Sequence, residues 1–391
     1  VLTTAHIIAQ DFEWQQRTSM PVPRWGAGTF VTNGAAYVVG GRSNGVDYPQ
    51  MWAYDPIADS WTQKASFPGT PRRLATTFAA NGKGYYGCGI TGSSTYLSDF
   101  WEYDPMANSW AQKASFPGGP RYNTWQFVLN GIAHVGSGIS TGASGPFHAD
   151  AFTYDPTTNA WTTAIPIPDQ GRHGAIGFAM GGKGYVVVGR ENSLSFVQDL
   201  WSYDPTTTSW AAMTAFGGEP RSSPLVFQYY NDAVIGCGRD ATTNHYDVWA
   251  FNPSLNTWSQ IPSYPGATAM AGSSFSIGNR AFGGLGWDLA SDLSHADLWE
   301  LVKSGNVSID ERSTEALIRL NPNPAADDGV RITSATPGSV SLKLLSSDGR
   351  MVHAMTITHE GLVSTAELSA GVYFMHWEHE DEYGTIKLVI H

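Results

Sequence analysis

The chain has 391 residues, enough for two or three domains with substantial cores. Its formal net charge of −12 argues against nucleic acid as a partner, because phosphate binding needs a basic surface. No run of about 18 apolar residues occurs, so we predict no transmembrane segment. A content of 43 glycines with 13% aromatic and only 14% charged residues favours an all-β protein.

The first residues are apolar and lead to a small residue at Ala9. This pattern is typical of the end of a secretory signal peptide. An ordinary flanking segment would look the same, so residues 1–11 are assigned to a signal-peptide remnant or an N-terminal flank.

Two aromatic series define an internal repeat over residues 12–302. One consists of tryptophans 47 to 51 residues apart: Trp14, Trp61, Trp110, Trp161, Trp210 and Trp258. Where both series are present in one repeat, the other precedes it by nine residues: Trp52, Trp101, Phe152, Trp201 and Trp249, with Trp299 in the last copy. A period of nearly 50 residues fits the four-stranded blade of a β-propeller. We interpret both series as structural.

Residues 72–110 illustrate one repeat. Leu74–Ala80 predicts a small apolar inner strand, and Asn81-Gly82 a hairpin turn with positive φ. The Gly-rich residues 84–89 predict the second strand and residues 100–103 the third. Asp104-Pro105 then turns the chain towards the strand that carries Trp110. The two aromatic series should be cross-strand neighbours that pack between blades.

A Gly-rich second strand, an aromatic residue before Asp-Pro and a Trp soon after resemble the kelch repeat over residues 14–301. The resemblance implies a β-propeller. The sixth copy lacks the initial Arg, the Asp-Pro and a fourth strand of its own. Phe12–Arg17 has the character of such a fourth strand. We therefore predict a six-bladed propeller closed by pairing of this N-terminal strand with the strand that carries Trp299.

The two cysteines, Cys88 and Cys237, occupy equivalent places three repeats apart. In a ring of six repeats they lie on opposite sides, beyond the roughly 7 Å between Cα atoms that a disulfide allows. We expect two unpaired, buried residues at the ends of second strands.

The repeat stops after Leu301, and residues 303–316 predict a polar linker. Residues 317–391 alternate in short strands, which indicates a small antiparallel Ig-like β-sandwich. The order of four short motifs resembles the C-terminal sorting domain of the type IX secretion system of Bacteroidota: residues 321–324, 348–350, 371–373 and 387–390. This resemblance implies the secretion machinery as a partner and a secreted or outer-membrane surface location. The alternative is a generic Ig-like accessory module.

Arginines gather on the face that carries the loops between second and third strands. Arg24, Arg72, Arg73, Arg121, Arg172 and Arg221 begin first strands, while Arg42, Arg190 and Arg239 follow second strands. Asp99, Asp150, Asp199, Asp247 and Asp297 stand two residues before the third-strand aromatic, so we expect Arg–Asp pairs that tie blade to blade. Arg42, Arg73, Arg190 and Arg239 break the pattern and are better candidates for ligand binding.

The loops between second and third strands vary most between repeats, and variable loops on a rigid scaffold often bind ligands. Their aromatic and histidine side chains are suited to sugar rings or peptides, although packing on neighbouring loops is the alternative. The candidate ligand-binding residues are Arg42, Tyr48, Arg73, Tyr96, His148, Arg190, Phe196, Arg239, His245, Trp287 and His295.

Two kelch enzymes offer alternatives. The copper galactose oxidases need convergent His and Tyr ligands, but here the histidines come from different blades without ligand spacing, so we expect no metal and no cofactor. The sialic-acid mutarotases resemble this chain in six blades and an Arg-rich mouth; ring opening needs a general acid or base, for which Glu191, Asp240 or His173 are candidates. The favoured prediction is a binding or adhesion module for a glycan or a protein, with a mutarotase-type enzyme as the alternative.

Overall fold

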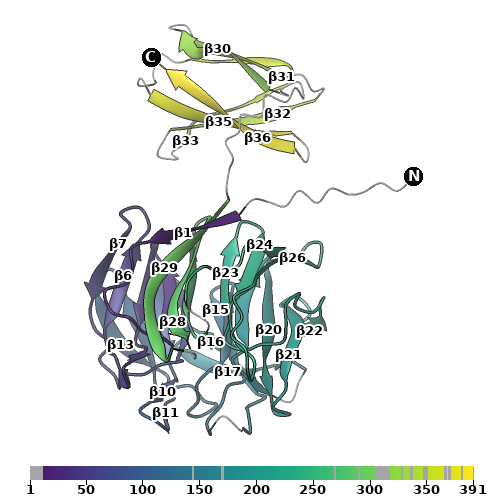
Figure 1. Ribbon diagram of the computed structural model, residues 1–391. Helices are drawn as coiled ribbons and strands as arrows, with labels where there is room; N and C mark the ends of the chain where they lie inside the picture. Colours follow the sequence, from purple (N-terminus) through teal and green to yellow (C-terminus); the bar gives the residue numbers. More distant parts are fainter. Residues whose placement is uncertain are drawn as a thin grey trace. The chain divides into compact units, whose positions relative to one another are not determined.

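The computed structural model describes residues 12–142, 145–168, 171–267, 270–288, 291–303, 318–326, 329–334, 338–346, 351–364, 368, 371–379 and 382–390. The chain divides into two compact units, Val1–Gly305 and Asn306–His391 (Figure 1). All regular elements among these described residues are β-strands, in agreement with the predicted all-β class. Residues 1–11, assigned to a signal remnant or flank, and residues 304–316 of the predicted linker lie outside the described residues.

Six antiparallel sheets, each with a four-strand path, make up the described part of the first unit (Figure 1). In the first three, listed from inner to outer strand, the strands are β2 (Gly28–Thr32), β3 (Ala35–Val39), β6 (Met51–Asp55) and β7 (Ser60–Lys64); β8 (Thr76–Ala80), β9 (Lys83–Gly87), β12 (Phe100–Asp104) and β13 (Ser109–Lys113); and β14 (Trp125–Leu129), β15 (Ile132–Gly136), β16 (Ala151–Asp155) and β17 (Ala160–Ala164).

The other three sheets have the same order. Their strands are β19 (Ile176–Met180), β20 (Lys183–Glu191), β21 (Phe196–Asp204) and β22 (Ser209–Ala212), with the short β18 (Arg172–His173) also on β20; β23 (Leu225–Tyr229), β24 (Asp232–Gly236), β25 (Val248–Asn252) and β26 (Thr257–Ile261); and β27 (Ser273–Ile277), β28 (Arg280–Asp288), β29 (Leu293–Lys303) and β1 (Phe12–Arg17). Two small hairpins, β4 (Arg42–Ser43) with β5 (Val46–Asp47) and β10 (Ile90–Thr91) with β11 (Thr95–Tyr96), lie in loops between second and third strands.

The N-terminal strand completes the last sheet, as predicted. β1 runs antiparallel to β29, with Trp14 opposite Leu301 and Gln16 opposite Trp299. Phe12 is buried and packs edge-on against Tyr229, at 5.6 Å between ring centroids. The pairing covers the outer edge of β29, which would otherwise expose its backbone groups.

The fourth-strand tryptophans link each sheet to the sheet before it. Every indole Nε1 donates to a backbone carbonyl just after the preceding outer strand, at 2.8–3.0 Å: Trp14 to Pro262, Trp61 to Thr18, Trp110 to Ala65, Trp161 to Ala114, Trp210 to Ile165 and Trp258 to Thr214. The two aromatic series are diagonal cross-strand neighbours, and in the second sheet both pack against Phe67 from the preceding repeat. The residue opposite Trp110 is Tyr103, and Trp101 stands opposite Gln112.

A second closed ring of hydrogen bonds runs around the inner ends of the sheets. The backbone N–H of one residue in each repeat donates to the carbonyl of its counterpart in the preceding repeat, and the first repeat closes the ring on the sixth: Leu74 to Gly26, Asn123 to Leu74, Gly174 to Asn123, Ser223 to Gly174, Ala271 to Ser223 and Gly26 to Ala271. All six residues have φ between 51° and 64°, a left-handed conformation that turns these amides towards the neighbouring sheet. The six sheets are thereby joined in a circle.

Both cysteines are buried and unpaired, as predicted. Cys88 and Cys237 directly follow second strands and have φ of 54° and 58°. Burial raises the pKa of the Cys88 thiol to about 12, and it raises that of Cys237 as well. Neither thiol is a reactive nucleophile at neutral pH.

The C-terminal unit is one seven-stranded sheet path in the order β33-β32-β35-β36-β30-β31-β34. Side chains from β31, β32, β33, β34, β35 and β36 enter one hydrophobic cluster that includes Ile332, Leu342, Ile357, Met375 and Leu388. The motif at residues 348–350 lies outside the described residues. The strands are β30 (Ile318–Ala326), β31 (Gly329–Ser334), β32 (Val340–Ser346), β33 (Met351–Ile357), β34 (Glu360–Val363), β35 (Gly371–His379) and β36 (Glu382–Ile390).

Candidate functional site

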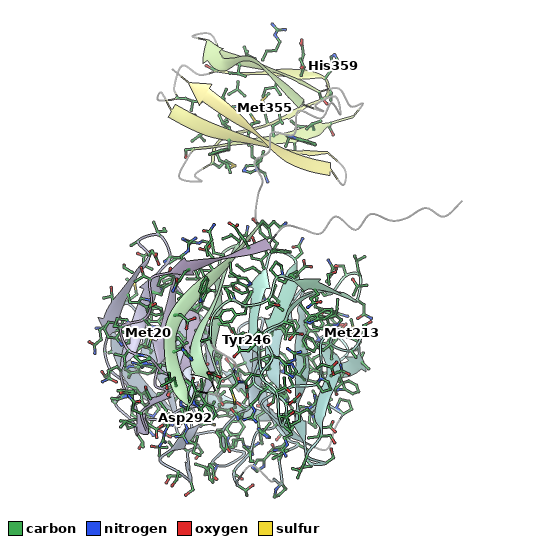
Figure 2. The ribbon with its side chains drawn as sticks, viewed as in Figure 1. Met20, Met213, Tyr246, Asp292, Met355 and His359 are labelled. Atoms are coloured by element: carbon green, nitrogen blue, oxygen red, sulfur yellow. The ribbon has the colours of Figure 1, made fainter. Side chains whose placement is uncertain are left out.

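The variable loops between second and third strands emerge at the end of the propeller that carries β10 and β11, at the bottom of Figure 1. Asp292, from the loop of the sixth sheet, lies at the same end (Figure 2). The first-strand arginines also lie at this end, because the residue after each of them forms a backbone bridge near the end of a second strand. This end therefore holds every arginine that we singled out.

The repeated arginines are part of the scaffold. Arg24, Arg72, Arg121, Arg172 and Arg221 are all 0% exposed. In each, Nη1 donates to the carbonyl 16 residues further along, such as that of Cys88 for Arg72. Burial with these bonds makes all five part of the scaffold, and none of them is exposed at the surface.

In four repeats a carboxylate neutralises the arginine. Arg72 donates from Nη1 and Nη2 to the two carboxylate oxygens of Asp99, at 2.6 and 2.8 Å. The pairs Arg121–Asp150, Arg172–Asp199 and Arg221–Asp247 are equivalent. Each pair lies within one repeat, so our expectation that the pairs tie blade to blade was wrong. The backbone makes that link instead, since the Arg72 carbonyl accepts from Gly41 N–H of the preceding repeat.

The Trp of the third strand often completes this arrangement. Trp101 Nε1 donates to Asp99 at 2.7 Å, and Trp201 and Trp249 bind their own Asp in the same way. Burial opposes ionisation of Asp99, but the hydrogen bonds and charge of Arg72, together with Trp101, hold its pKa below the ordinary value. The carboxylate is thus kept charged between two sets of donors.

A ring of six dissimilar side chains directly follows the repeated arginine position: Trp25, Arg73, Tyr122, His173, Ser222 and Met270. Each forms a backbone bridge with a residue near the end of a second strand, inside that strand for Arg190 and Trp287 and three residues beyond it for Arg42, Ile90, Ile139 and Arg239. Our sequence reasoning identified Arg73, Arg190, Arg239, Arg42 and Trp287 but missed Trp25, Tyr122, Ser222 and Met270 as binding candidates. The sequence could have indicated them, because they directly follow the repeated arginine position and their residue type differs in every repeat.

Several ring members stack on neighbouring loops. Trp25 stacks on Trp287, with ring centroids 5.6 Å apart and planes 24° apart, and Arg73 lies over Trp25 at 5.2 Å. Tyr96 is nearly parallel to Tyr122 at 5.6 Å. The structure therefore unites Trp287 and Arg73 in one cluster and places Tyr96 in another.

The pattern-breaking arginines have protein partners. Arg42 and Arg73 both bind Asp47, at 3.2 and 2.8 Å, and Asp47 also accepts from the Gly92 N–H of the next repeat. Arg190 lies over Phe196 at 5.4 Å, and its Nε donates to the Leu194 carbonyl. Arg239 donates to the Asp240 and Ala241 carbonyls. These contacts order the loops.

The remaining candidates divide into loop contacts and buried groups. His148 bonds Ser140 at 2.8 Å, and His245 lies 3.2 Å from Asp240. Tyr48 lies under the Arg24 guanidinium at 5.3 Å. The buried Nε2 of His295 has no hydrogen-bond partner among the described residues. No group of three or more His, Cys, Asp or Glu suited to a metal occurs in the described part of the chain.

His173 is the ring member with the most perturbed titration. Its imidazole packs edge-on against Phe147 at 4.6 Å, and both ring nitrogens are buried without a partner among the described residues. Burial, assisted by Arg190, lowers its pKa to about 4. The imidazole is therefore neutral at physiological pH.

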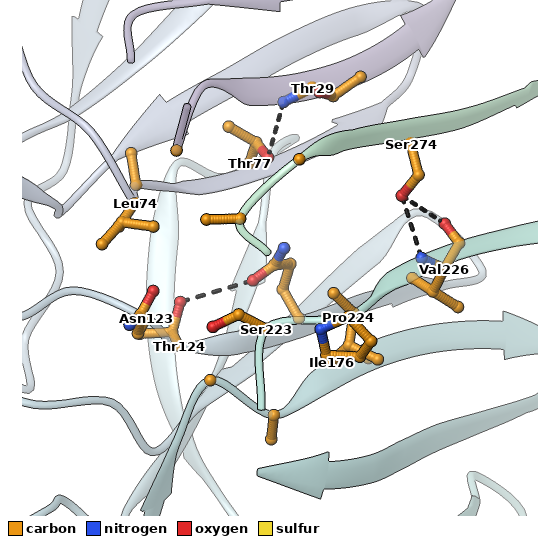
Figure 3. Close-up of a pocket in the computed structure, with 18 of the residues that line it drawn as sticks. Thr29, Leu74, Thr77, Asn123, Thr124, Ile176, Ser223, Pro224, Val226 and Ser274 are labelled. Atoms are coloured by element: carbon orange, nitrogen blue, oxygen red, sulfur yellow. Dashed lines mark hydrogen bonds between the residues drawn. The ribbon is translucent and has the colours of Figure 1, made fainter. Parts of the chain in front are cut away.

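A cavity of about 170 Å³ occupies the centre of the propeller, and residues of all six sheets or their first-strand entries line it (Figure 3). Its lining is uncharged; the polar members include Thr29, Thr77, Asn123, Gln126, Ser223 and Ser274. The hydroxyl of Thr77 accepts from the Thr29 N–H, and Ser274 Oγ bonds both backbone groups of Val226. The cavity is suited to a neutral polar group.

Comparison with known proteins supports the architecture of both units. A family model for the Kelch motif matches residues 23–68, and one for the secretion system C-terminal sorting domain matches residues 319–391. The chain is similar to the solved structure of YjhT, with a TM-score of 0.62 and 19% identity over 72% of this chain and 95% of that one. That likeness shows a shared β-propeller fold.

No curated protein matches the chain. Among the described residues, no helix is long and apolar enough to cross a membrane. The sorting domain indicates export by the type IX secretion system to the cell surface or the medium. The chain thus combines a β-propeller fold that contains a Kelch motif at residues 23–68 with a secretion system C-terminal sorting domain at residues 319–391.

Proposed function

We propose that this exported protein is a binding or adhesion module whose ligand, a glycan, docks at the loop end of a six-bladed propeller. The six four-stranded sheets and the two closed rings of hydrogen bonds support six blades. We assign residues 12–302 to the propeller, 303–316 to a linker and 317–391 to a sorting domain with an Ig-like sandwich fold. The cluster shared by strands β31 to β36 supports the sandwich.

The observation that carries the binding proposal is the ring of dissimilar side chains, each of which directly precedes a residue that lines the central cavity; we call this ring the mouth. The neighbouring positions follow one pattern, because a buried Arg precedes five of the six ring members and a residue with left-handed backbone conformation follows each of them. A scaffold role would favour the same residue in every repeat, as it does for those arginines. Side chains that differ between otherwise equivalent places make the mouth asymmetric, which a specific ligand requires.

Chemistry favours a glycan over a protein. The mouth offers half-buried aromatic rings in Trp25, Trp287, Tyr96 and Tyr122, which suit the apolar faces of sugar rings. The cavity behind it is neutral and lined by hydroxyl and amide groups. These groups match sugar hydroxyls, whereas a charged peptide would leave its charges without partners there.

The alternative is an enzyme that opens and closes an acidic sugar ring, as the sialic-acid mutarotases do. His173 is a candidate by position, because neither ring nitrogen has a hydrogen-bond partner among the described residues, but burial lowers its pKa to about 4 and makes it a weak base at neutral pH. Glu191 lies 3.6 Å from the buried Arg172, and Asp240 caps its own loop by accepting from the Thr242 and Thr243 N–H groups. Of the three, only His173 belongs to the ring of dissimilar side chains, so it is the residue to test.

A glycan array probed with the full chain tests the proposal, together with an assay of anomer exchange in sialic acid. We expect array binding that is lost in Tyr122→Ala and kept in Tyr230→Ala, whose side chain lies in a turn at the opposite end and is 53% exposed. Binding that survives Tyr122→Ala but fails in Tyr230→Ala would place the site elsewhere. Accelerated anomer exchange, abolished by His173→Ala, would favour the enzyme instead.

A further inference from the structure

The arginine arrangement is broken at one place in the circle, where the first and sixth sheets meet. In the first repeat, Gln50 occupies the position of Asp99, two residues before the third-strand Trp52. In the sixth repeat, Asp297 is present, but the sequence has Ala269 where the others have Arg. One repeat therefore keeps the cation without its carboxylate, and its neighbour keeps the carboxylate without its cation.

Arg24 consequently has few partners. Its Nη1 donates to the Gly40 and Gln50 carbonyls at 2.8 and 3.1 Å. Its Nε and Nη2 are buried and have no partner among the described residues. Burial, only partly offset by Tyr48 and Tyr86, lowers the pKa of this guanidinium to about 10. That direction agrees with a buried cation that no carboxylate neutralises.

The groups that surround the missing carboxylate are unpartnered too. Trp52 Nε1, the equivalent of the Trp101 Nε1 that donates to Asp99, is buried and has no acceptor among the described residues. Gln50 Oε1 is likewise buried and has no donor among them. Buried polar groups in proteins are normally satisfied, and each one left unpaired is costly. Three donors, from Arg24 Nε, Arg24 Nη2 and Trp52 Nε1, thus remain where the other repeats hold a carboxylate.

We propose that the first repeat binds a small monovalent anion, a halide or a free carboxylate, between Arg24 and Trp52. The anion takes the place that the Asp99 carboxylate has in the second repeat. Guanidinium and indole N–H groups are suited to such a ligand. The proposal is independent of the glycan site.

Solvent reaches the corresponding place in the other repeats. The side chains of Asp99, Asp150, Asp199 and Asp247 are 25–40% exposed, although the arginines that they bind are 0% exposed. An anion can therefore approach Arg24 from the side on which those carboxylates stand. The neutral Gln50 side chain occupies this approach and can yield by rotation about its single bonds.

The anion would act on ring closure. Arg24 N–H donates to the His295 carbonyl, and the Arg24 carbonyl accepts from the Gly286 N–H, so this residue joins the first sheet to the sixth. Neutralising a buried cation at this junction stabilises the closed ring. The free energy gained depends on ligand concentration by mass action.

Thermal unfolding of the full chain in buffers of constant ionic strength tests the proposal. Sodium chloride and, in a separate arm, sodium acetate replace the sodium salt of a bulky sulfonate. We expect the wild-type propeller transition to rise by roughly 1–2 °C in at least one arm, as a ligand worth about 1 kcal/mol would cause in a domain of this size. Chloride alone would identify a halide site, and acetate alone a carboxylate site.

Gln50→Asp gives Arg24 the carboxylate partner that Asp99 gives Arg72. The Tm of this variant should therefore lie above that of wild type at low anion concentration and should not rise when the anion is added. Gln112→Asp is the matched control, because it adds the same charge at an exposed position of β13, in the repeat where Asp99 already neutralises Arg72. It should keep the wild-type response. Equal responses of wild type and Gln50→Asp in both arms would overturn the proposal. So would a crystal soaked in bromide without anomalous density between Arg24 and Trp52.

Discussion

Truncation of Trp14 tests whether β1 holds the ring closed. Trp14 lies edge-on to Tyr264 at 5.3 Å and to Phe227 at 6.0 Å, and its indole N–H donates to the Pro262 carbonyl at 3.0 Å. These contacts join the sixth sheet to the fifth. They belong to the ring of six equivalent indole bonds, so the loss weakens one junction of a closed structure.

The cost follows from the packing. Replacing a fully buried Trp by Ala costs about 3–5 kcal/mol, and Trp14 is only partly buried, so about 2–3 kcal/mol is expected for Trp14→Ala. Trp14→Phe keeps a ring against Tyr264 but loses the hydrogen bond, which costs about 1 kcal/mol. At roughly 1.6 °C per kcal/mol for a unit of this size, Tm should fall by about 3–5 °C for Trp14→Ala and about 1.5 °C for Trp14→Phe.

Differential scanning calorimetry of the full chain measures both variants. Gln16→Ala, an exposed change on the same strand, should stay within roughly ±0.5 kcal/mol of wild type. If Trp14→Ala melts together with Gln16→Ala, β1 does not stabilise the propeller and the closure argument fails.

Three further predictions concern export, binding and pH. Removal of residues 317–391 should leave the propeller in the periplasm of a Bacteroidota host with a functional type IX system, as cell fractionation would reveal; its continued presence in the medium would contradict the sorting role. Trp287→Ala and Arg190→Ala should each weaken ligand binding by roughly 1–3 kcal/mol in titration calorimetry, whereas Tyr230→Ala should bind normally. Burial lowers the folded-state pKa of His134 to about 4, so the unfolded chain takes up a proton at higher pH than the folded chain. Stability should be complete above the ordinary His pKa and fall as the pH drops from there towards 4. His134→Phe should flatten that part of a chemical-denaturation profile against pH, and an unchanged slope would argue against the buried neutral imidazole.

Much of the scaffold could be predicted from local chemistry. The missing fourth strand of the last repeat and the likeness of residues 12–17 to such a strand predicted the β1–β29 pairing, because an uncovered strand edge needs a partner. Repeat arithmetic alone separated Cys88 from Cys237. The sorting domain was predicted from short motifs whose order is specific.

The partners of the charged side chains were decided by tertiary structure. Sequence spacing placed Arg72 and Asp99 on the same face, but only the path of the strands shows that the pair closes within one repeat and that the backbone joins neighbours. The same holds for Arg42 and Arg73, which the sequence offered as ligand contacts and which converge on Asp47. Several carboxylates lie at comparable sequence separation from each arginine. Which of them becomes its partner depends on which one the fold brings within hydrogen-bond distance of the buried guanidinium. That geometry exists only once all six sheets have closed, so the unmatched Arg24 became visible only in the folded ring.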